Sequence, residues 1–285
     1  MKEKIENAIE TALSLGASYA DIRFTSRKRE NVSVKNGKPE AISSSEDQGI
    51  GVRVIAEGSW GFSSSSNVSD IDRVVKNAID IARSSNLTKK SNVVLAEAEP
   101  IRAAYSTPFQ IDPFSVSLEE KLTLLLQADS LMNINSKIKI REASLMSFLE
   151  NKIFANTEGS YITQKRIETG GEIAATAIEG TEVQRRSYPN NFGDYQSRGF
   201  EFIKEMGLER NAQRVAEEAL ELLSAPKAPA GEQTIIVDGG QLTLQVHESI
   251  GHPIELDRVF GTEASYAGDS FLKPIHLAGG LCLSF

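Results

Sequence analysis

Alternation between apolar and polar positions divides the first 90 residues into a helix, several strands and a second helix. Apolar residues recur at helical spacing from Ile5 to Leu13. Alternating residues over 21–25 and 31–34, and a β-branched run over 49–55, are typical of strands. A second amphipathic helix is expected over 69–82, where Val74, Val75, Ala78 and Ile79 share a face. We therefore expect a sheet packed against helices.

The same order returns further along the chain. Helical spacing from Ser117 to Leu131 precedes strand patterns over 138–188, and a last amphipathic helix is expected over 208–223. No residue-by-residue repeat relates the two regions, so a duplication is only suspected. Helix, antiparallel strands and helix, twice over, indicate an α+β fold rather than alternating βα units.

Local signals mark the ends of these elements. Asn36-Gly37 between two strand patterns predicts a two-residue hairpin turn, because both residues tolerate positive φ. Asn156-Thr157-Glu158-Gly159 predicts a second hairpin turn. Ser117 with Glu120 forms a capping box at the start of a helix.

Proline-rich and polar stretches suggest the domain boundaries. We expect an N-terminal α+β domain over 1–90, a linker over 91–112 and a middle α+β domain over 113–228. Ala225 to Gly231 holds two prolines and a glycine, and marks the next boundary. The remaining residues, 229–285, would begin a third domain with a strand at 233–240, followed by a helix that starts near Gln241.

Composition and charge exclude several classes of protein. The chain has 285 residues, one Cys and a net charge of −8, so neither a disulfide framework nor a general nucleic-acid surface is expected. No stretch is long and apolar enough to span a membrane, and the charged N-terminus lacks an apolar signal-peptide core. We therefore expect a cytoplasmic protein with no membrane or nucleic-acid partner.

Two of the three histidines lie close together, in His247-Glu248-Ser249-Ile250-Gly251-His252. Imidazoles are common zinc ligands, and a carboxylate beside the first of them can take a proton from a metal-bound water. On a regular α-helix, residues five apart lie about 140° apart around the axis, too far for one ion. Gly251 would permit a distortion, and Pro253 disfavours the α conformation at His252. A widened, π-like turn would bring the histidines together. A chance pair of histidines at a helix end is the alternative.

The residues that follow resemble the TldD branch of the TldD/PmbA family. The likeness is carried by His-Glu-x-x-x-His, by Glu255-Leu256-Asp257-Arg258, and by the stretch from Tyr266 to Leu272. It is specific over 235–272 and looser upstream, at 20–23, 49–53 and 58–62.

The resemblance implies a zinc metalloprotease that hydrolyses peptides or unfolded polypeptides and works as a homodimer or as a heterodimer with a related subunit that lacks the metal motif. By the same resemblance, His247 and His252 would bind Zn²⁺ and Glu248 would act as the general base. The third domain would be a mostly β metallopeptidase domain that carries this helix.

The residues near the motif allow two interpretations, one functional and one structural. Glu255 or Asp257 could orient a metal-binding imidazole, or could belong to an ion-paired turn. Tyr266 could stabilise an oxyanion, although an aromatic residue in such a setting is more often packed in a core.

The third zinc ligand is the main departure from the family. Family members supply a Cys far downstream, whereas this chain ends soon after Leu272. His276 and Cys282 are weak substitutes, because a lone Cys in an apolar tail usually acts as a small hydrophobic residue. We therefore expect a C-terminally truncated chain with an incomplete third domain. The alternative function is a non-catalytic partner or peptide-binding subunit with an incomplete metal site.

Overall fold

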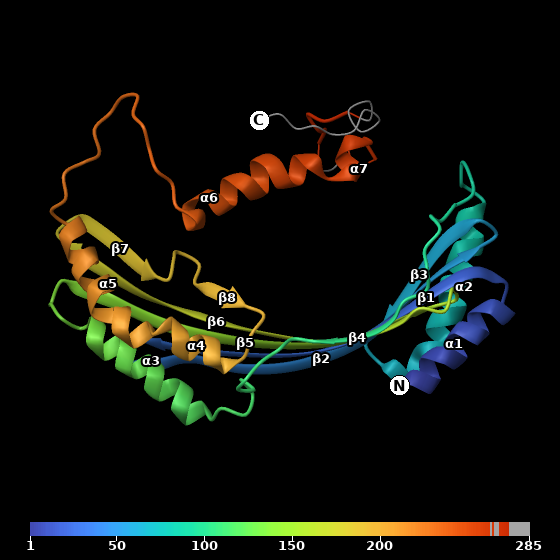
Figure 1. Ribbon diagram of the computed structural model, residues 1–285, viewed down its shortest axis with the longest axis horizontal. Coiled ribbons are helices and arrows are strands. Elements are labelled where there is room, and N and C mark those ends of the chain that lie inside the picture. Colours follow the sequence, from blue (N-terminus) through green and yellow to red (C-terminus); the bar gives the residue numbers. More distant parts are fainter. Residues whose placement is uncertain (263, 265–267, 274–285) are drawn as a thin grey trace. The chain divides into compact units, whose positions relative to one another are not determined.

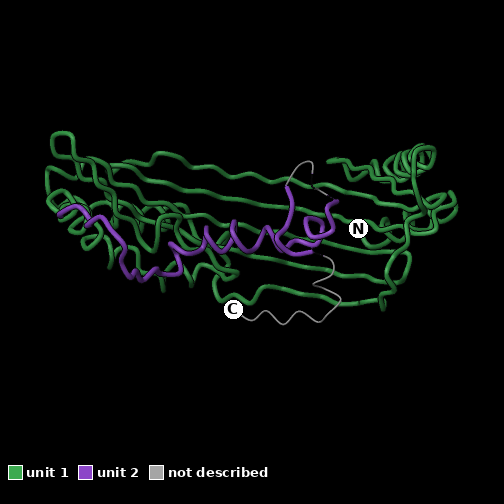
Figure 2. Tube along the Cα trace, turned by 90° about the horizontal axis from the view of Figure 1, so that it is seen from above, with its two compact units in different colours: residues 1–225 green, residues 226–285 purple. Residues whose placement is uncertain are grey.

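The computed structural model describes residues 1–262, 264 and 268–273. The chain forms two compact units, Met1–Ala225 and Pro226–Phe285, drawn in different colours in Figure 2. The division falls within the Ala225–Gly231 segment, and residues 1–90 and 113–228 both contribute to the first unit. The separation of that unit into two domains stays a prediction.

The first unit contains two runs of elements joined by a long connection. The first run comprises α1 (Lys2–Ser14), β1 (Ala17–Lys35), β2 (Lys38–Ala56), β3 (Ser59–Ser65), a 3₁₀ turn (Val68–Asp70) and α2 (Ile71–Asn86). The connection holds β4 (Arg102–Ser106), a strand within the predicted linker. The second run comprises α3 (Leu118–Met132), β5 (Ile138–Asn156), β6 (Tyr161–Glu179), β7 (Glu182–Tyr188), β8 (Asp194–Gln196), α4 (Phe200–Met206) and α5 (Leu208–Leu222). These helices and antiparallel strands confirm the α+β fold class.

The two runs have the same plan, which the sequence only suggested. In each, a helix precedes two strands of 19 residues and one strand of 7 residues, and a long helix closes the run. In each, the short strand pairs with the end of the second long strand: Ile50–Ala56 pairs with β3, and Ile173–Glu179 pairs with β7. The likeness is therefore one of topology.

A single eight-stranded sheet joins the two runs, in the order β3-β2-β1-β5-β6-β4, with β7 and β8 also paired to β6. At its centre β1 and β5 pair antiparallel, and the register sets Ile22 opposite Ala155 and Val32 opposite Leu145. β4 is parallel to β6. Figure 1 shows the long strands passing from one group of helices to the other.

The hydrophobic core lies in two clusters at opposite ends of this sheet. Ile22 and Ala155 belong to the cluster under α1 and α2, while Val32 and Leu145 belong to the cluster with α3, α4 and α5. Directly opposed residues on antiparallel strands point to the same face, and so do residues an even number apart on one strand, as Ile22 and Val32 are on β1. Both helix groups therefore cover one face of the sheet (Figure 1).

Several predicted local features are confirmed. Asn36 and Gly37 form the β1–β2 turn with φ of 47° and 75°. The 156–159 turn joins β5 to β6. Ser117 Oγ accepts a hydrogen bond from the Glu120 backbone N–H, which is the helix-cap half of the predicted capping box. The predicted strands at 21–25 and 31–34, in contrast, are parts of one continuous strand, β1.

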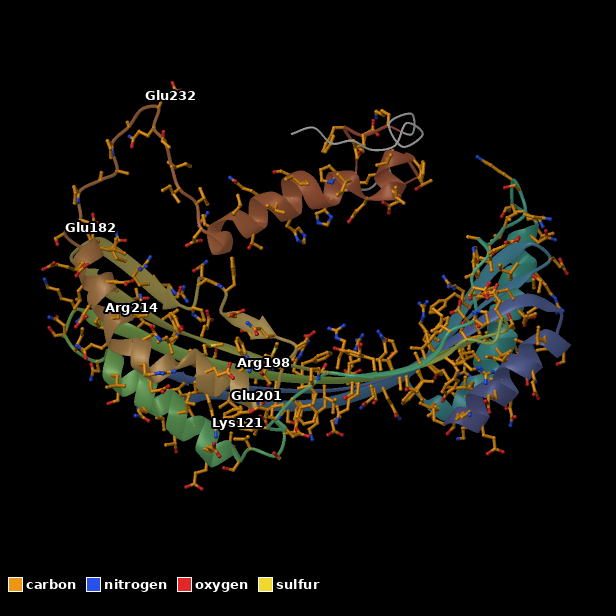
Figure 3. All side chains as sticks on the ribbon, in the orientation of Figure 1. Lys121, Glu182, Arg198, Glu201, Arg214 and Glu232 are labelled. Carbon is orange, nitrogen blue, oxygen red and sulfur yellow. The ribbon has the colours of Figure 1, made fainter. Side chains whose placement is uncertain are left out.

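Buried ion pairs stabilise the second helix group. Lys121 is almost fully buried in α3, and its ammonium donates a hydrogen bond to Glu30 of β1. Asp129, also in α3, is 2% exposed and pairs with Arg141 at 3.2 Å. Figure 3 labels Lys121 at this end of the sheet, with Glu201 of α4. Removing one partner of such a pair would leave a buried charge without compensation.

The described part of the second unit contains only helical elements: α6 (Gly239–Val246), a π turn (His247–Gly251), a 3₁₀ turn (His252–Ile254) and α7 (Leu256–Val259). The predicted strand at 233–240 is wrong, because residues 233–238 have no regular secondary structure and α6 begins at Gly239. The predicted helix start near Gln241 is therefore two residues late. Among the described residues no helix is long and apolar enough to cross a membrane.

Candidate metal centre

The helix that leads to the two histidines begins at an aspartate cap. Asp238 Oδ1 accepts a hydrogen bond of 2.8 Å from the Gln241 backbone N–H and so satisfies one of the free donors at the start of α6. From the sequence, Asp238 was predicted to lie in the strand at 233–240. An acidic residue just before an apolar helical pattern was the signal for this cap.

A π turn follows α6 and carries both histidines, as predicted. The His252 backbone N–H donates to the His247 carbonyl, five residues earlier, which is the hydrogen bond that defines a π turn. The two imidazole rings consequently lie edge to face, with their centroids 4.5 Å apart and their planes at 81°. The widened turn therefore removes the angular separation that a regular α-helix would impose.

The predicted cause of the distortion is wrong in two details. His252 has φ −64° and ψ −44°, so it keeps the α conformation in spite of Pro253. Gly251 has φ −57° and ψ −57°, which any residue can adopt. Pro253 lacks a backbone N–H, so it cannot donate the next helical hydrogen bond, and a 3₁₀ turn starts there instead.

His247, Glu248 and His252 form a cluster with the donor chemistry of a metal site. One ligand atom from each lies within 4.8 Å of the others. His247 and Glu248 are exposed, and His252 is partly buried. The two imidazoles are ligands that suit zinc, and the carboxylate beside them can accept a proton from a metal-bound water; a catalytic zinc site ordinarily takes a third protein ligand besides. The structure therefore brings together all three residues that the sequence singled out.

Glu255 contacts the cluster, and Asp257 does not. Glu255 Oε1 lies 2.9 Å from His252 Nδ1, and its Oε2 lies 3.5 Å from Arg258 Nε. The Asp257 carboxylate instead accepts a hydrogen bond from the Arg258 backbone N–H at 2.9 Å. Of the two carboxylates that the sequence offered, only Glu255 is placed to orient an imidazole.

Ser270 ties a later segment to the same turn. Its side chain is buried and donates a hydrogen bond to the Pro253 carbonyl, the residue after His252. The neighbouring Asp269 has a pKa below its ordinary range, because the Lys273 ammonium and the Ser270 backbone N–H both stabilise the carboxylate. No role was predicted for Ser270 from the sequence, although it lies in the stretch that resembles the family. Tyr266, His276 and Cys282 lie outside the described residues.

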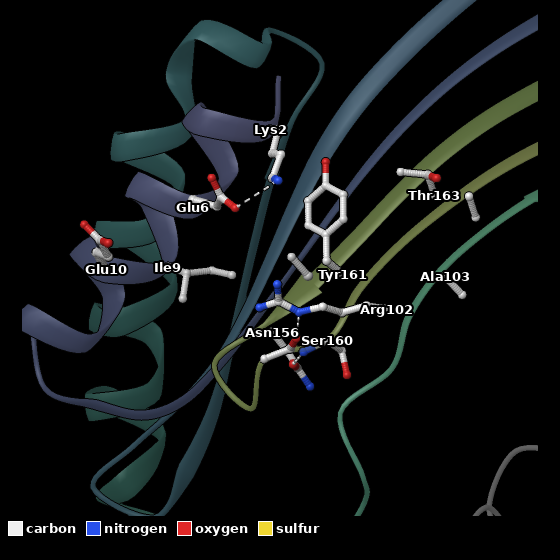
Figure 4. A pocket seen from close by; sticks show the side chains of 13 residues that line it. Lys2, Glu6, Ile9, Glu10, Arg102, Ala103, Asn156, Ser160, Tyr161 and Thr163 are labelled. Atoms are coloured by element: carbon white, nitrogen blue, oxygen red, sulfur yellow. Dashed lines mark hydrogen bonds and ion pairs between the residues drawn. The ribbon is translucent and has the colours of Figure 1, made fainter.

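A separate groove lies in the first unit, between α1 and the strands β4, β5 and β6 (Figure 4). It encloses about 530 Å³. Lys2 and Glu6 line it as an exposed ion pair of 3.9 Å, and Arg102 donates to the Gly159 carbonyl at 3.1 Å. Lys2, Glu6 and Arg102 are thus engaged with one another or with backbone, and the residues that line the groove include neither histidine nor cysteine.

Comparison with known proteins identifies the family. Residues 20–82 match the family model PmbA/TldA metallopeptidase domain 1, and residues 111–225 match the PmbA/TldA metallopeptidase central domain. Together the two models account for more than half of the chain. The chain belongs to the PmbA/TldD family. The predicted resemblance is therefore confirmed.

Curated relatives in the family are described as metalloproteases. The chain is 30% identical over 267 residues to one from Methanocaldococcus jannaschii, which covers 93% of this chain and 56% of that protein. It is 26% identical over 256 residues to a metalloprotease TldD homolog of Buchnera aphidicola, covering 88% of this chain and 52% of that protein. The chain thus spans about half the length of the curated relatives it matches.

Solved structures share the fold of the family. A Bacteroides thetaiotaomicron protein described as a proposed modulator of DNA gyrase matches with a TM-score of 0.68 and 15% identity, over 88% of this chain and 56% of that one. TldE from Thermococcus kodakarensis matches with a TM-score of 0.56 and 14% identity, over 77% of this chain and 47% of that one. At these identities the matches establish the fold alone.

Proposed function

We propose that this chain belongs to a zinc-dependent peptidase that hydrolyses peptides or unfolded polypeptides. The observation that carries the proposal is the cluster of His247, Glu248 and His252 on a single π turn. Membership of a metallopeptidase family and relatives described as metalloproteases support the same reaction class. We further propose a dimeric, cytoplasmic protein, for which the single Cys and the family resemblance are the support.

The residues have distinct roles in the proposed reaction. His247 and His252 would hold the zinc ion, which, when bound, supplies Lewis-acid chemistry to water and to the scissile carbonyl. Glu248 is exposed beside them, so its carboxylate can take the proton of the attacking water and return it to the leaving amine. An extended polypeptide could present its backbone to this exposed turn.

Metal content and peptide cleavage test this proposal. The protein to which this chain belongs is expected to retain one zinc ion after dialysis and to cleave an unfolded polypeptide such as reduced casein. Because general-base catalysis contributes roughly 10²–10⁴-fold, Glu248→Gln is expected to lower cleavage at least about 100-fold. Glu232→Gln, at an exposed position of the same unit, is the matched control.

Two outcomes would contradict the proposal. Equal cleavage by Glu248→Gln and the unaltered chain would remove Glu248 from the reaction. Absence of both zinc and cleavage would favour the alternative, a non-catalytic partner or peptide-binding subunit, for which polypeptide binding without turnover is the expected result.

A further inference from the structure

Glu255 sits where its backbone and side chain are both fixed against the histidine turn. Its backbone N–H donates to the His252 carbonyl at 3.2 Å, and its own carbonyl accepts from the Val259 N–H at 3.0 Å as α7 begins. From this position the carboxylate reaches back to His252 Nδ1 at 2.9 Å. The contact thus joins two short helical segments of the second unit.

A second contact holds the other oxygen of the same carboxylate. Arg258, one turn along α7, places its Nε 3.5 Å from Glu255 Oε2. This Nε is buried and makes no hydrogen bond. Among the ion pairs of the described residues, its anionic partner is Glu255. Arg258, Glu255 and His252 therefore form a chain of polar contacts that ends on an imidazole.

The contact between Glu255 and His252 determines which nitrogen of the His252 imidazole carries a proton and which can bind a metal. An ionised carboxylate can only accept hydrogen bonds, so His252 Nδ1 must carry the proton. A neutral imidazole protonated at Nδ1 has its lone pair on Nε2. Metal-binding histidines commonly donate their other N–H to a carboxylate, and loss of such a partner typically weakens metal binding 10–100-fold.

We infer that Glu255 is a positioning residue, which holds His252 in the Nδ1–H tautomer and leaves Nε2 as the metal-binding atom. Asp257 has no such role, because among the described residues its carboxylate makes no hydrogen bond or ion pair with either imidazole and its Oδ1 accepts from the Arg258 backbone N–H. The inference rests on the proposed function for the metal, while the tautomer itself is a property of the metal-free chain.

Nitrogen NMR on the metal-free 285-residue chain, labelled with ¹⁵N-histidine, tests the tautomer directly. At about pH 8.5, where imidazoles are ordinarily neutral, His252 is expected to show a protonated Nδ1 and an unprotonated Nε2. A His252→Gln spectrum assigns the signals. Glu255→Ala is expected to move His252 toward the Nε2–H tautomer, whereas Glu255→Gln should retain Nδ1–H, because the amide oxygen can still accept.

Zinc affinity, measured by competition with a chromogenic chelator, is the second readout. Glu255→Ala is expected to raise the Kd for zinc about 10–100-fold, Glu255→Gln to restore most of the affinity, and Glu232→Ala to change nothing.

The two readouts separate the inference from the proposed function. An Nε2–H tautomer in the unaltered chain, or a Glu255→Ala variant with unchanged tautomer and affinity, would overturn the role of Glu255. A chain that shows the expected tautomers but binds no zinc would support the orienting contact and contradict the proposed zinc function.

Discussion

The two units differ most in how much of each is buried. The first unit has two hydrophobic clusters on one face of a continuous sheet, together with buried ion pairs. In the described part of the second unit only Val259 and Ser270 are buried. Large apolar side chains such as Ile236 and Phe271 are exposed there. The unit that carries the candidate chemistry is therefore the one with little core of its own.

This contrast shows what holds the candidate site together. The histidine turn depends on hydrogen bonds close in sequence: the Asp238 cap, the π-turn bond between His252 and His247, and the Glu255 contact. The first unit depends on packing between residues far apart in sequence, such as Ile22 and Ala155. Changes in packing should thus damage the first unit, and changes in local polar contacts should damage the second.

The largest expected effect comes from Gly61→Ala in β3. A Cβ at this position would lie 1.9 Å from the Ala78 carbonyl oxygen and 2.6 Å from the Ala82 backbone nitrogen, both in α2. Helix backbone cannot move aside as a flexible side chain can, so we expect a loss of about 1–3 kcal/mol in the free energy of unfolding. Urea denaturation followed by circular dichroism measures it.

Gly239→Ala is the matched control in the second unit. No atom lies within 4 Å of the added Cβ, so its free energy of unfolding should agree with that of the unaltered chain within about 0.5 kcal/mol. Similar losses for the two variants would contradict the contrast between a closely packed first unit and an open second unit.

Zinc should protect the second unit and leave the first unchanged. A ligand that binds only the folded state stabilises it by about 2.7 kcal/mol at 100 times its Kd. In limited trypsinolysis we therefore expect zinc to slow cleavage after Arg258 about tenfold or more, with no change in cleavage within 1–225. His247→Ala should abolish the protection. Protection that persists in this variant would place the zinc elsewhere.

Two carboxylates of the first unit should give opposite responses to pH. Burial opposes ionisation of Glu201 (Figure 3), but the backbone N–H groups of Ile111 and Gly199 donate to it at 3.0 Å and lower its pKa overall. The folded state then binds fewer protons than the unfolded state, so this stabilisation is present above the ordinary glutamate pKa of about 4.3 and is lost as the pH falls. Glu201→Gln should cost about 2 kcal/mol at pH 7 and less near pH 3.

Glu172 should behave in the reverse way and more weakly. Burial raises its pKa, although Arg185 opposes the shift, and its Oε2 has no hydrogen-bond partner. The folded state then binds more protons, so its contribution to stability falls as the pH rises through the raised pKa. Glu172→Gln should therefore stabilise the chain at pH 7, by less than about 1 kcal/mol.

Chemical denaturation at several pH values measures the effects of Glu201→Gln and Glu172→Gln, with the exposed Glu182→Gln as the control. Parallel pH profiles for the two variants would contradict these assignments.

Local signals in the sequence were sufficient to predict the turns, caps and candidate site. Asn36-Gly37 and the Ser117 cap act through neighbouring residues, and the i, i+5 histidine spacing indicated the π turn that closes on the His247 carbonyl. The reason for that turn was predicted incorrectly, because Pro253 acts through its missing N–H rather than through the backbone conformation of His252.

Features that depend on distant pairing could not be predicted. The stretch from Ser26 to Glu30 contains only polar and charged residues, so it shows no alternation between apolar and polar positions, yet β2 and β5 pair with it on both sides and make β1 continuous. The β-branched run from Ile235 to Val237 has a strand-like composition but no strand partner among the described residues. The choice between Glu255 and Asp257 was left open by the sequence for a different, local reason: it depends on where the 3₁₀ turn ends.

X-ray absorption spectroscopy of the zinc-loaded 285-residue chain tests the central claim most directly, namely that the π turn brings His247 and His252 to a single ion. The account predicts two imidazole ligands for each zinc, with zinc–nitrogen distances of about 2.0–2.1 Å, and one imidazole in His247→Ala. A spectrum of the unaltered chain with one imidazole, or with none, would contradict it.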